Sequence, residues 1–441
     1  MFTIGVVSDL VQSNEPVELA LVDIDPAALD VARKLVEKMI AAKQAPIRLS
    51  ASTERREVLK GASAVISAIG VGGRRAWEQD VFQARKYGIS MPVGDTAGPC
   101  GTSRALRMIP AMVAIARDVL DLTPDALFFN YANPMSPICR AVRKETGAEM
   151  VGLCIGTWDT AHYLARALSV PFEDLSYNVA GINHLTWFSE VKVRGQDAMP
   201  ALREYARAVV AKTNQAYEAF RAGDAPMPHS GSPFDSSLDF PFSWQCLLWF
   251  GAFPSPEDRH VTEFFPSLFR DGSYYGKKLG VDEFPFEGTI EVGDMIYAEM
   301  QADAFSPEPL TESYFNKHGG EQEQVIEIIR AIRANQPMTF FANLPNQGQA
   351  PNLPMDAIVE TPALATGSGI RAITQQALPT AAAGVLAGRF AWVEVTVEAA
   401  LEKNRDKFIQ ALLLDGAVQS PDIAPRLADD LLAAQREFLE W

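Results

Sequence analysis

The segment from Ala126 to Met135 reads ALFFNYANPM, and it decides the fold that we expect for this chain. Its first four residues are apolar, as in a buried parallel strand, and the polar residues from Asn130 onwards mark the point where such a strand reaches a ligand crevice. Pro134 prevents further strand pairing. We therefore expect the carboxyl edge of a parallel sheet here, with Asn130 and Asn133 lying on it.

Two further apolar segments end in residues that bind metals in other proteins. Residues 150–153 lead to Cys154, and residues 179–182 lead to Asn183 and His184. A thiolate and an imidazole suit a divalent transition metal that keeps positions open for substrate oxygens. Each residue alone is more typical of a buried core position. Their occurrence at neighbouring strand ends of one sheet favours a metal site.

Strands alternate with helices over the first part of the chain, which is the pattern of a doubly wound, Rossmann-type parallel sheet. We expect residues 1–170 to form this dinucleotide-binding domain. Residues 171–441 are expected to form an α+β substrate domain, with the site between the two. Helices are predicted, among other places, at residues 26–43, 102–122, 200–222 and 394–414.

Asp23 follows a predicted strand at residues 17–23. It stands where the second strand of a dinucleotide-binding unit carries the acid that binds the adenosine ribose. The first strand and its Gly-x-Gly-x-x-Gly turn are expected about 20 residues upstream of such an acid, and this sequence lacks most of that distance. We therefore expect the first strand to be missing, either because the start codon was placed too late or because the pyrophosphate site has been lost. Gly70 and Gly72 follow another predicted strand, and their backbone offers a close approach to a cofactor.

The composition restricts the class of protein. The chain has 441 residues, of which 48% are hydrophobic, and a formal net charge of −16. This acidity disfavours nucleic acids and anionic membranes as partners and favours a small-molecule ligand. Four cysteines are too few for a disulfide scaffold, and no apolar run approaches the length of a membrane helix. No signal peptide is recognisable, so we expect a cytoplasmic protein.

Five motifs, taken together, resemble the family-four glycoside hydrolases. They lie in the family's order over nearly the whole chain. Within the family, residues 258–260 and 182–187 most resemble the α-galacturonidase branch. The motifs are VGDT at 93–96, NYANPM at 130–135, GLC at 152–154, GINH at 181–184, and NLPNQG at 343–348 continuing to NLP at 352–354.

The resemblance implies a fold like that of lactate and malate dehydrogenases, and a glycosidase that depends on NAD and Mn2+. Such enzymes are an exception to hydrolysis by two carboxylates. In this family a hydride leaves carbon three of the sugar, a base removes the proton on carbon two, and the glycosidic oxygen is eliminated. Water and the hydride are then added back.

Residue roles follow from the motifs. Cys154 and His184 would be the metal ligands. Asp258 is the expected base and Asp95 the expected acid for the leaving group, although a surface ion cluster and a loop cap are plainer explanations of these two residues. Cofactor contacts are expected at Asp23, Gly70, Gly72 and Asn130, and substrate contacts at Asn133, Asn183, Arg259, His260 and Arg107, with the arginines available for a uronate carboxylate.

One departure from the family pattern is the residue after the metal cysteine. It is commonly His or Asn, whereas here it is Ile155. The absent glycine-rich turn is the other departure, and both favour a non-catalytic sugar- or nucleotide-binding relative as an alternative. A second alternative is an oxidoreductase like the 2-hydroxy-acid dehydrogenases, against which Cys154 and the motif at 343–352 argue. The expected partner is a small-molecule glycoside, best a uronide, and the expected assembly is a homodimer or homotetramer.

Overall fold

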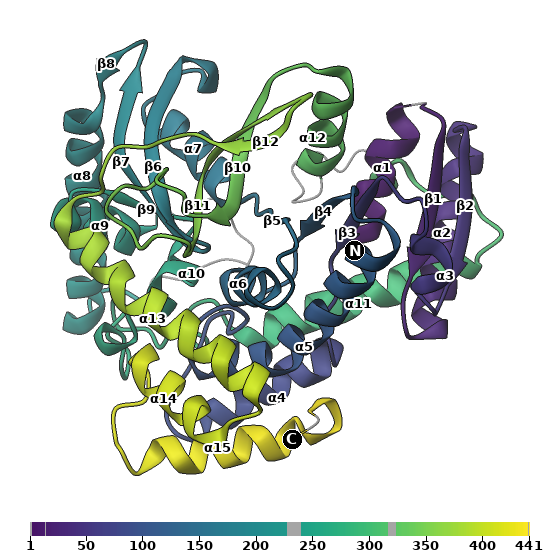
Figure 1. Ribbon diagram of the computed structural model, residues 1–441. Helices are drawn as coiled ribbons and strands as arrows, with labels where there is room; N and C mark the ends of the chain where they lie inside the picture. The colour runs from purple at the N-terminus through teal and green to yellow at the C-terminus, as the bar shows by residue number, and fades with distance from the viewer. Residues whose placement is uncertain (1, 14, 227–239, 316–322, 440) are drawn as a thin grey trace.

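The computed structural model describes residues 2–13, 15–226, 240–315, 323–439 and 441 (Figure 1). Up to residue 170, strands and helices alternate as predicted from the sequence. The elements of this part are α1 (Phe2–Ser13), β1 (Val17–Val22), α2 (Pro26–Lys43), β2 (Ile47–Ser52), α3 (Arg56–Leu59), β3 (Ala64–Ser67), α4 (Gly73–Arg85), α5 (Gly98–Leu122), β4 (Leu127–Asn130), α6 (Met135–Thr146), β5 (Met150–Gly152) and α7 (Gly156–Ala167).

The strands of this part are parallel and fall into two sheets. β1 pairs with β2, while β3 pairs with β4 and β4 with β5. A dinucleotide-binding sheet has the strand order 3-2-1-4-5-6. Here β2, β1, β3, β4 and β5 correspond to strands 3, 2, 4, 5 and 6, and strand 1 has no counterpart among the described residues. Among the residues that the structure describes, no strand joins β1 to β3. The parallel strands of the described residues are therefore divided between two sheets, with a break between β1 and β3.

Helices cover both faces of the sheet formed by β3, β4 and β5. Phe128 and Phe129 are neighbours on β4, so their side chains point to opposite faces. Phe128 belongs to a core with residues of α5 and α6, whereas Phe129 belongs to a core with residues of α1 and α2. This two-sided burial explains the continuous apolar run at the strand. The predicted doubly wound arrangement is confirmed.

The rest of the chain continues the sheet with antiparallel strands. Gly152 of β5 pairs with Asn343 of β10, so that one mixed sheet continues through β10 and β11 into β6 and β7. The elements are η1 (Phe172–Asp174), β6 (Leu175–Ile182), β7 (Leu185–Val193), β8 (Gln196–Asp197), α8 (Met199–Ala222), α9 (Pro241–Phe250), β9 (Phe253–Ser255), α10 (Asp258–Val261), η2 (Thr262–Phe264), η3 (Pro266–Leu268), α11 (Phe286–Phe305), η4 (Glu312–Tyr314), α12 (Glu323–Ala334), β10 (Met338–Pro345), β11 (Ile358–Thr366), β12 (Gly369–Ala372), α13 (Thr380–Glu402), α14 (Arg405–Asp415), α15 (Ile423–Ala434) and η5 (Arg436–Phe438).

The helix predicted at residues 394–414 is divided between α13 and α14. Lys403 adopts a left-handed conformation with φ of 50°, which ends α13. Asn404 then caps α14, because its side chain accepts hydrogen bonds from the N–H groups of Asp406 and Lys407. A lysine in the left-handed region is uncommon, so the sequence pattern did not predict this break.

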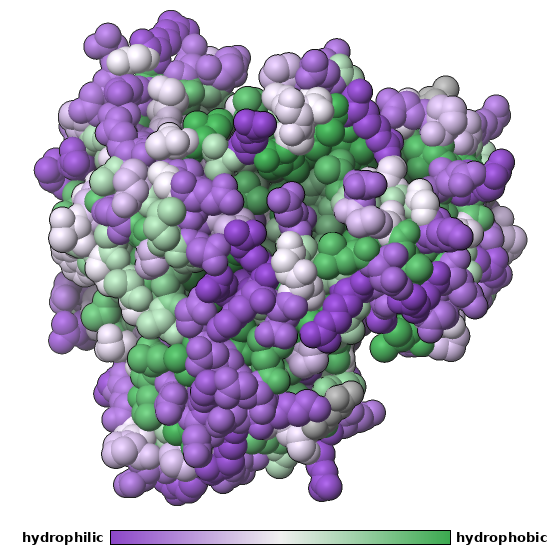
Figure 2. Space-filling view, in the orientation of Figure 1, coloured by the Kyte–Doolittle hydropathy of each residue, from purple (hydrophilic) through white to green (hydrophobic). Residues whose placement is uncertain are grey.

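The exposed surface is mixed rather than uniformly polar. Figure 2 shows hydrophobic residues near the middle of this face, with hydrophilic residues around them. Among the residues that the structure describes, no helix combines the length and the apolar character needed to cross a membrane.

Candidate active site

The site forms where polar side chains follow the carboxyl ends of the central strands. Asp95 lies in the loop before α5, His184 lies in the turn between β6 and β7, and His260 lies on α10. One carboxylate oxygen and one ring nitrogen from each histidine all lie within 4.8 Å of one another. A carboxylate with two imidazoles is a donor set that binds divalent transition metals.

A tight turn holds His184 in place. Asn183 and His184 form the two-residue connection between β6 and β7, where Ile182 pairs with Leu185. His184 has a φ of 65°, in the left-handed region. Such a conformation outside glycine costs on the order of 1–3 kcal/mol and is concentrated at functional sites. The neighbouring Gly181 is required by packing, because a Cβ there would lie 2.3 Å from the carbonyl oxygen of Leu185.

Thr96 links the carboxylate of Asp95 to the ring of His184. Its hydroxyl donates a hydrogen bond of 2.8 Å to Asp95 Oδ1 and lies 3.0 Å from His184 Nδ1. Because the single hydroxyl proton is directed to Asp95, Nδ1 of His184 must donate to Thr96. This leaves the Nε2 lone pair of His184 free to act as an acceptor or ligand.

Both histidines are held in the neutral form. Their ring centroids lie 4.3 Å apart, and His184 and His260 are 7% and 8% exposed. Burial lowers the pKa of His184, a trend that the carboxylate of Asp95 opposes. Burial lowers the pKa of His260 more strongly, and His184 and Arg259 add to the effect. Nδ1 of His260 is buried without a hydrogen-bond partner among the described residues. A neutral imidazole with an unused nitrogen is suited to bind a metal.

Asn133 and Arg104 border the carboxylate on its other side. Asn133 donates a hydrogen bond of 2.9 Å from Nδ2 to Asp95 Oδ2, and its backbone oxygen accepts one of 3.0 Å from Nε of Arg104. Burial lowers the pKa of Arg104, although Asp95 opposes this shift. A Cβ built on Gly70 would lie 3.7 Å from Nη2 of Arg104. Arg104 was not among the predicted site residues, and it lies between the expected cofactor turn and Asn133.

Cys154 follows β5, as expected, but its sulfur is not part of the cluster of Asp95, His184 and His260 among the described residues. The thiol is 8% exposed and accepts a hydrogen bond of 3.4 Å from the N–H of Gly156. Its role as a ligand therefore stays a prediction.

Two other residues predicted to contact cofactor or substrate form hydrogen bonds within the fold. Both polar atoms of the Asn130 side chain bond to the backbone of Ala132 at 3.0 Å, which closes the turn after β4. The Nδ2 atom of Asn183 donates to Oε2 of Glu360 at 3.2 Å. Both side chains thus shape the strand ends.

Asp258 is hydrogen-bonded within the fold, and its expected role as the base stays a prediction. It is fully buried and accepts hydrogen bonds from the N–H groups of Phe242 and Ser243, the Ser243 hydroxyl and the Tyr274 hydroxyl, at 2.6–2.8 Å. These donors include the first N–H groups of α9, so Asp258 caps that helix. Burial raises its pKa, against the effect of these hydrogen bonds. With its carboxylate filled in this way, Asp258 does not join the cluster.

Arg107 differs from the expectation. Its side chain and that of Asp80 are 0% exposed, and the two form a bidentate pair at 2.6 and 3.1 Å. The third guanidinium nitrogen donates to the carbonyl oxygen of Val71 at 3.0 Å. All three nitrogens are therefore committed within the fold, and none is left for a substrate carboxylate.

The remaining predicted residues lie around the cluster and at the edge of the first sheet. Nε of Arg259 lies 3.4 Å from Nε2 of His260 and 3.8 Å from a carboxylate oxygen of Glu257. Asp23 is exposed just beyond β1, where it accepts from the N–H of Asp25 at 2.9 Å. Gly72 has a φ of 77° at the start of α4, and a Cβ there would lie 2.4 Å from that of Ala76.

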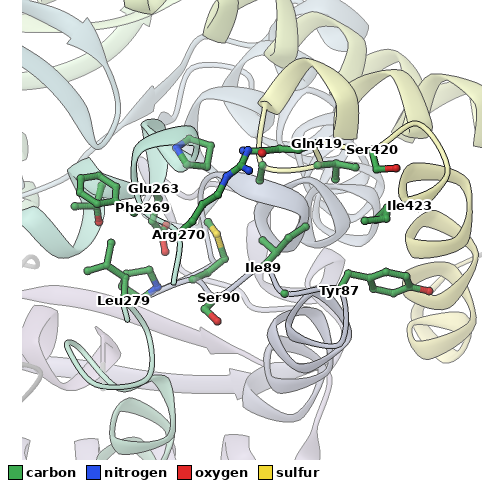
Figure 3. Close-up of a pocket in the computed structure, with 17 residues that line it drawn as sticks. Tyr87, Ile89, Ser90, Glu263, Phe269, Arg270, Leu279, Gln419, Ser420 and Ile423 are labelled. Atoms are coloured by element: carbon green, nitrogen blue, oxygen red, sulfur yellow. The ribbon is translucent and has the colours of Figure 1, made fainter. Parts of the chain in front are cut away.

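Glu263 lies behind the loop that carries Asp95 and was also not predicted. It is 3% exposed, and its Oε1 accepts from the N–H groups of Val93 and Gly94 at 2.7 and 2.8 Å. It also lines a cavity of about 260 Å³. Figure 3 shows Arg270 extending toward Gln419 and Ser420 at this cavity. An acid directly before two phenylalanines, in the segment VTEFF at 261–265, was the available sequence signal.

The fold and the cluster define an α/β protein with a metal-competent site at the carboxyl ends of its strands. Residues 1–170 match the family 4 glycosyl hydrolases, and residues 179–418 match the family 4 glycosyl hydrolase C-terminal domain. The chain belongs to the family 4 glycosyl hydrolases, and the resemblance stated from the motifs is confirmed.

Several characterised relatives are similar over most of their length. An α-galacturonidase of Bacillus subtilis is 32% identical, with 87% of this chain and 84% of the relative aligned. An α-glucosidase of Erwinia rhapontici is 29% identical over 100% of this chain and 96% of the relative. Among solved structures, a putative glucosidase from Bacillus subtilis is 28% identical with a TM-score of 0.80, covering 97% of this chain and 96% of that one.

Proposed function

We propose that this chain is an α-galacturonidase that uses NAD and a divalent cation, best Mn2+. Membership of the family makes it a glycosidase. The observation that carries the cofactor proposal is the cluster of Asp95, His184 and His260 at the strand ends. Two solved structures of the same fold, 20% identical 6-phospho-α-glucosidases from gut microorganisms, are described as complexes with NAD, one of them also with Mn2+.

The donor set fits a cation of this kind. Asp95, His184 and His260 would hold it, since both imidazoles are neutral and the carboxylate is hydrogen-bonded by Thr96 and Asn133. Hydrogen-bonded carboxylates and histidines of fixed tautomer are typical of metal ligands. We propose that Cys154 adds a thiolate from the neighbouring strand end. In this proposal Asp95 acts as a ligand rather than as the acid expected from the motif.

The NAD proposal rests on residues at the edges of β1 and β3. Asp23 would bind the adenosine ribose, and the backbone of Gly70 to Gly73 would lie against the nicotinamide end. When bound, NAD supplies a reversible hydride acceptor and the cation supplies a Lewis acid for adjoining sugar oxygens. The chain itself orients the sugar through Asn133, and buries His184 and His260 so that water competes poorly for the site.

The substrate proposal rests on cations near the cluster. Arg104 is largely buried, its terminal nitrogens have no ion-pair partner among the described residues, and it contacts Asn133. Arg259 lies next to His260. A buried guanidinium favours a carboxylate partner, which a uronide supplies and a neutral hexoside does not. The relatives named α-galacturonidase, at 30% and 32% identity, support the same substrate.

An isotope experiment tests the oxidative route. Hydrolysis of an α-galacturonide in heavy water, with NAD and Mn2+ added, should give a product with deuterium on carbon two, because a proton leaves that carbon before the glycosidic bond breaks. Proton NMR of the product measures this. Full activity without NAD would refute the proposal. A product without deuterium would do so once a substrate labelled at carbon two had excluded return of the same proton.

Metal analysis tests the ligand set separately. The parent chain, Cys154→Ser, His184→Ala and His260→Ala would be loaded with Mn2+, passed through a desalting column and analysed for bound metal. We expect retention by the parent and loss in both histidine variants. Equal occupancy in parent and histidine variants would refute the site, and unchanged occupancy in Cys154→Ser alone would remove the thiolate from it.

Self-association as a homodimer or homotetramer also stays a prediction, which sedimentation analysis would test.

A further inference from the structure

Glu360 is a buried carboxylate at the centre of the mixed sheet. It lies on β11, where it pairs with Asn343 of β10 on one side and Gly181 of β6 on the other. Its side chain is 1% exposed. The middle of a sheet is an unfavourable place for an acidic side chain, because removing a carboxylate from water is costly unless other groups compensate. Its presence there requires a physical reason.

The two oxygens of Glu360 reach the two turns that carry proposed metal ligands. Oε1 accepts a hydrogen bond of 2.6 Å from the hydroxyl of Thr157, in the first turn of α7. Oε2 accepts one of 3.2 Å from Nδ2 of Asn183. Thr157 stands three residues after Cys154, and Asn183 directly precedes His184. One carboxylate therefore ties the turn after β5 to the turn after β6.

The charge of Glu360 has no cationic counterpart within the described part of the chain. Its hydrogen-bond partners are neutral, and no Lys, Arg or His of the described residues forms an ion pair with it. Another buried glutamate, Glu283, is by contrast paired with Lys277. Burial raises the pKa of Glu360, while Thr157 and Asn183 favour the ionised form. A divalent cation held by the adjoining turns would favour that form further, because opposite charges attract strongly where water is excluded.

We propose that Glu360 is a positioning residue for the cation site, which it supports by orienting both ligand-bearing turns and by supplying a buried negative charge. This inference rests on the proposed function, since it requires that a divalent cation bind at these turns. Partners behind the ligands of a metal site commonly control affinity by about 10- to 100-fold. Glu360 lies behind the proposed ligands in this way, and its carboxylate is not part of the cluster of Asp95, His184 and His260.

Titration of the full chain with Mn2+ alone tests the inference without measuring activity. Glu360→Gln keeps the size and one acceptor but removes the charge, so its Mn2+ dissociation constant should rise by about 10- to 100-fold. Glu283→Gln is the matched control, because it also neutralises a buried glutamate. It should lower the thermal stability of the protein and leave Mn2+ affinity unchanged.

The outcomes separate the two proposals. If the parent chain does not bind Mn2+, the proposed function fails and the role of Glu360 fails with it. If the parent binds and Glu360→Gln binds equally well, only the inference about Glu360 is refuted. Should Glu360→Gln not fold, as judged by circular dichroism, Thr157→Val provides the test. It keeps the charge and removes one orienting hydrogen bond, so a measurable but smaller loss of affinity is expected, and no loss would refute the inference.

Discussion

Glu263 accepts a hydrogen bond of 2.8 Å from the N–H of Gly94, the residue directly before Asp95. The same oxygen accepts a second bond from Val93, so two consecutive peptide groups are fixed to η2. Gly94 has a φ of 68°, and a Cβ there would lie 2.8 Å from a methyl carbon of Val81. The conformation of the loop that carries Asp95 therefore depends both on the left-handed backbone of Gly94 and on the buried side chain of Glu263 from a distant segment.

We predict that Glu263 makes the folded protein less stable as the pH rises from about 5 to about 8. Burial raises its pKa from 4.5 to about 8. Between these values the unfolded chain has lost a proton that the folded chain retains, so stability falls by up to about 1.4 kcal/mol per pH unit. Glu263→Gln is neutral throughout and still accepts both N–H groups. Thermal unfolding at several pH values should show the variant gaining stability relative to the parent as the pH rises.

The control for this experiment is Glu287→Gln. Glu287 is half exposed and pairs with Arg85, which lowers its pKa. A depressed pKa contributes stability that is lost only as the pH falls below the ordinary range of a glutamate. Glu287→Gln should therefore show no trend between pH 5 and 8. A difference in thermal stability between the parent and Glu263→Gln that stays constant from pH 5 to 8 would contradict the prediction.

Local signals explain which parts of the fold could be predicted. The helix predicted at residues 26–43 has the same bounds as α2, because Asp25 caps it with hydrogen bonds to Ala27 and Ala28 and Pro26 begins it. No strand was predicted at β2, although Ile47, Leu49 and Ala51 alternate with polar residues there. The alternation extends over only six residues and ends in the small Ala51, so it is a weak signal for a strand.

The sequence motifs predicted which segments would meet at the strand ends, but not the contacts of the individual side chains. The sequence analysis named Asp95, His184 and His260 in three different roles, and the structure brings one possible ligand atom of each together. The roles of Asp258 and Arg107 depend on partners from distant segments, 16 and 27 residues away in sequence. Hydrogen bonds of this kind carry no local signature, so a buried cap and an exposed base look the same in a sequence.

We predict that Asp258→Asn acts mainly through stability. The amide cannot accept on both of its terminal atoms, so donors at the start of α9 lose their partner, and each hydrogen bond to a charged group contributes about 1.5–3 kcal/mol. Denaturant unfolding should show a loss of at least about 2 kcal/mol. Asp282→Asn is the control, because Asp282 is exposed and accepts one local bond from the Lys278 N–H. If Asp258→Asn kept the stability of the parent but lost hydrolytic activity, the result would instead support Asp258 as the base.

We predict that this chain binds NAD weakly, with a dissociation constant in the high micromolar range or above. β1 and β3 belong to separate sheets among the described residues, and the pyrophosphate of a dinucleotide normally rests on the turn after a strand between them. Calorimetric titration with NAD measures the affinity, and Asp23→Ala provides a variant that should weaken it further. Micromolar or tighter binding would show that another segment supplies the pyrophosphate site.

Arg104 should determine the preference for a uronide, because its guanidinium is the largely buried cation next to Asn133. We expect Arg104→Gln to raise KM for an α-galacturonide by about 10- to 100-fold, the equivalent of one lost charge-assisted hydrogen bond. KM for the corresponding α-galactoside should change little, since that substrate lacks the carboxylate, so the ratio of the two kcat/KM values should fall. Arg117→Gln is the control, because Arg117 is 62% exposed and pairs loosely with Glu145 at 3.6 Å. If Arg104→Gln impairs both substrates equally, Arg104 supports the loop of Asn133 or the cofactor instead, and Arg259 becomes the remaining candidate for the carboxylate.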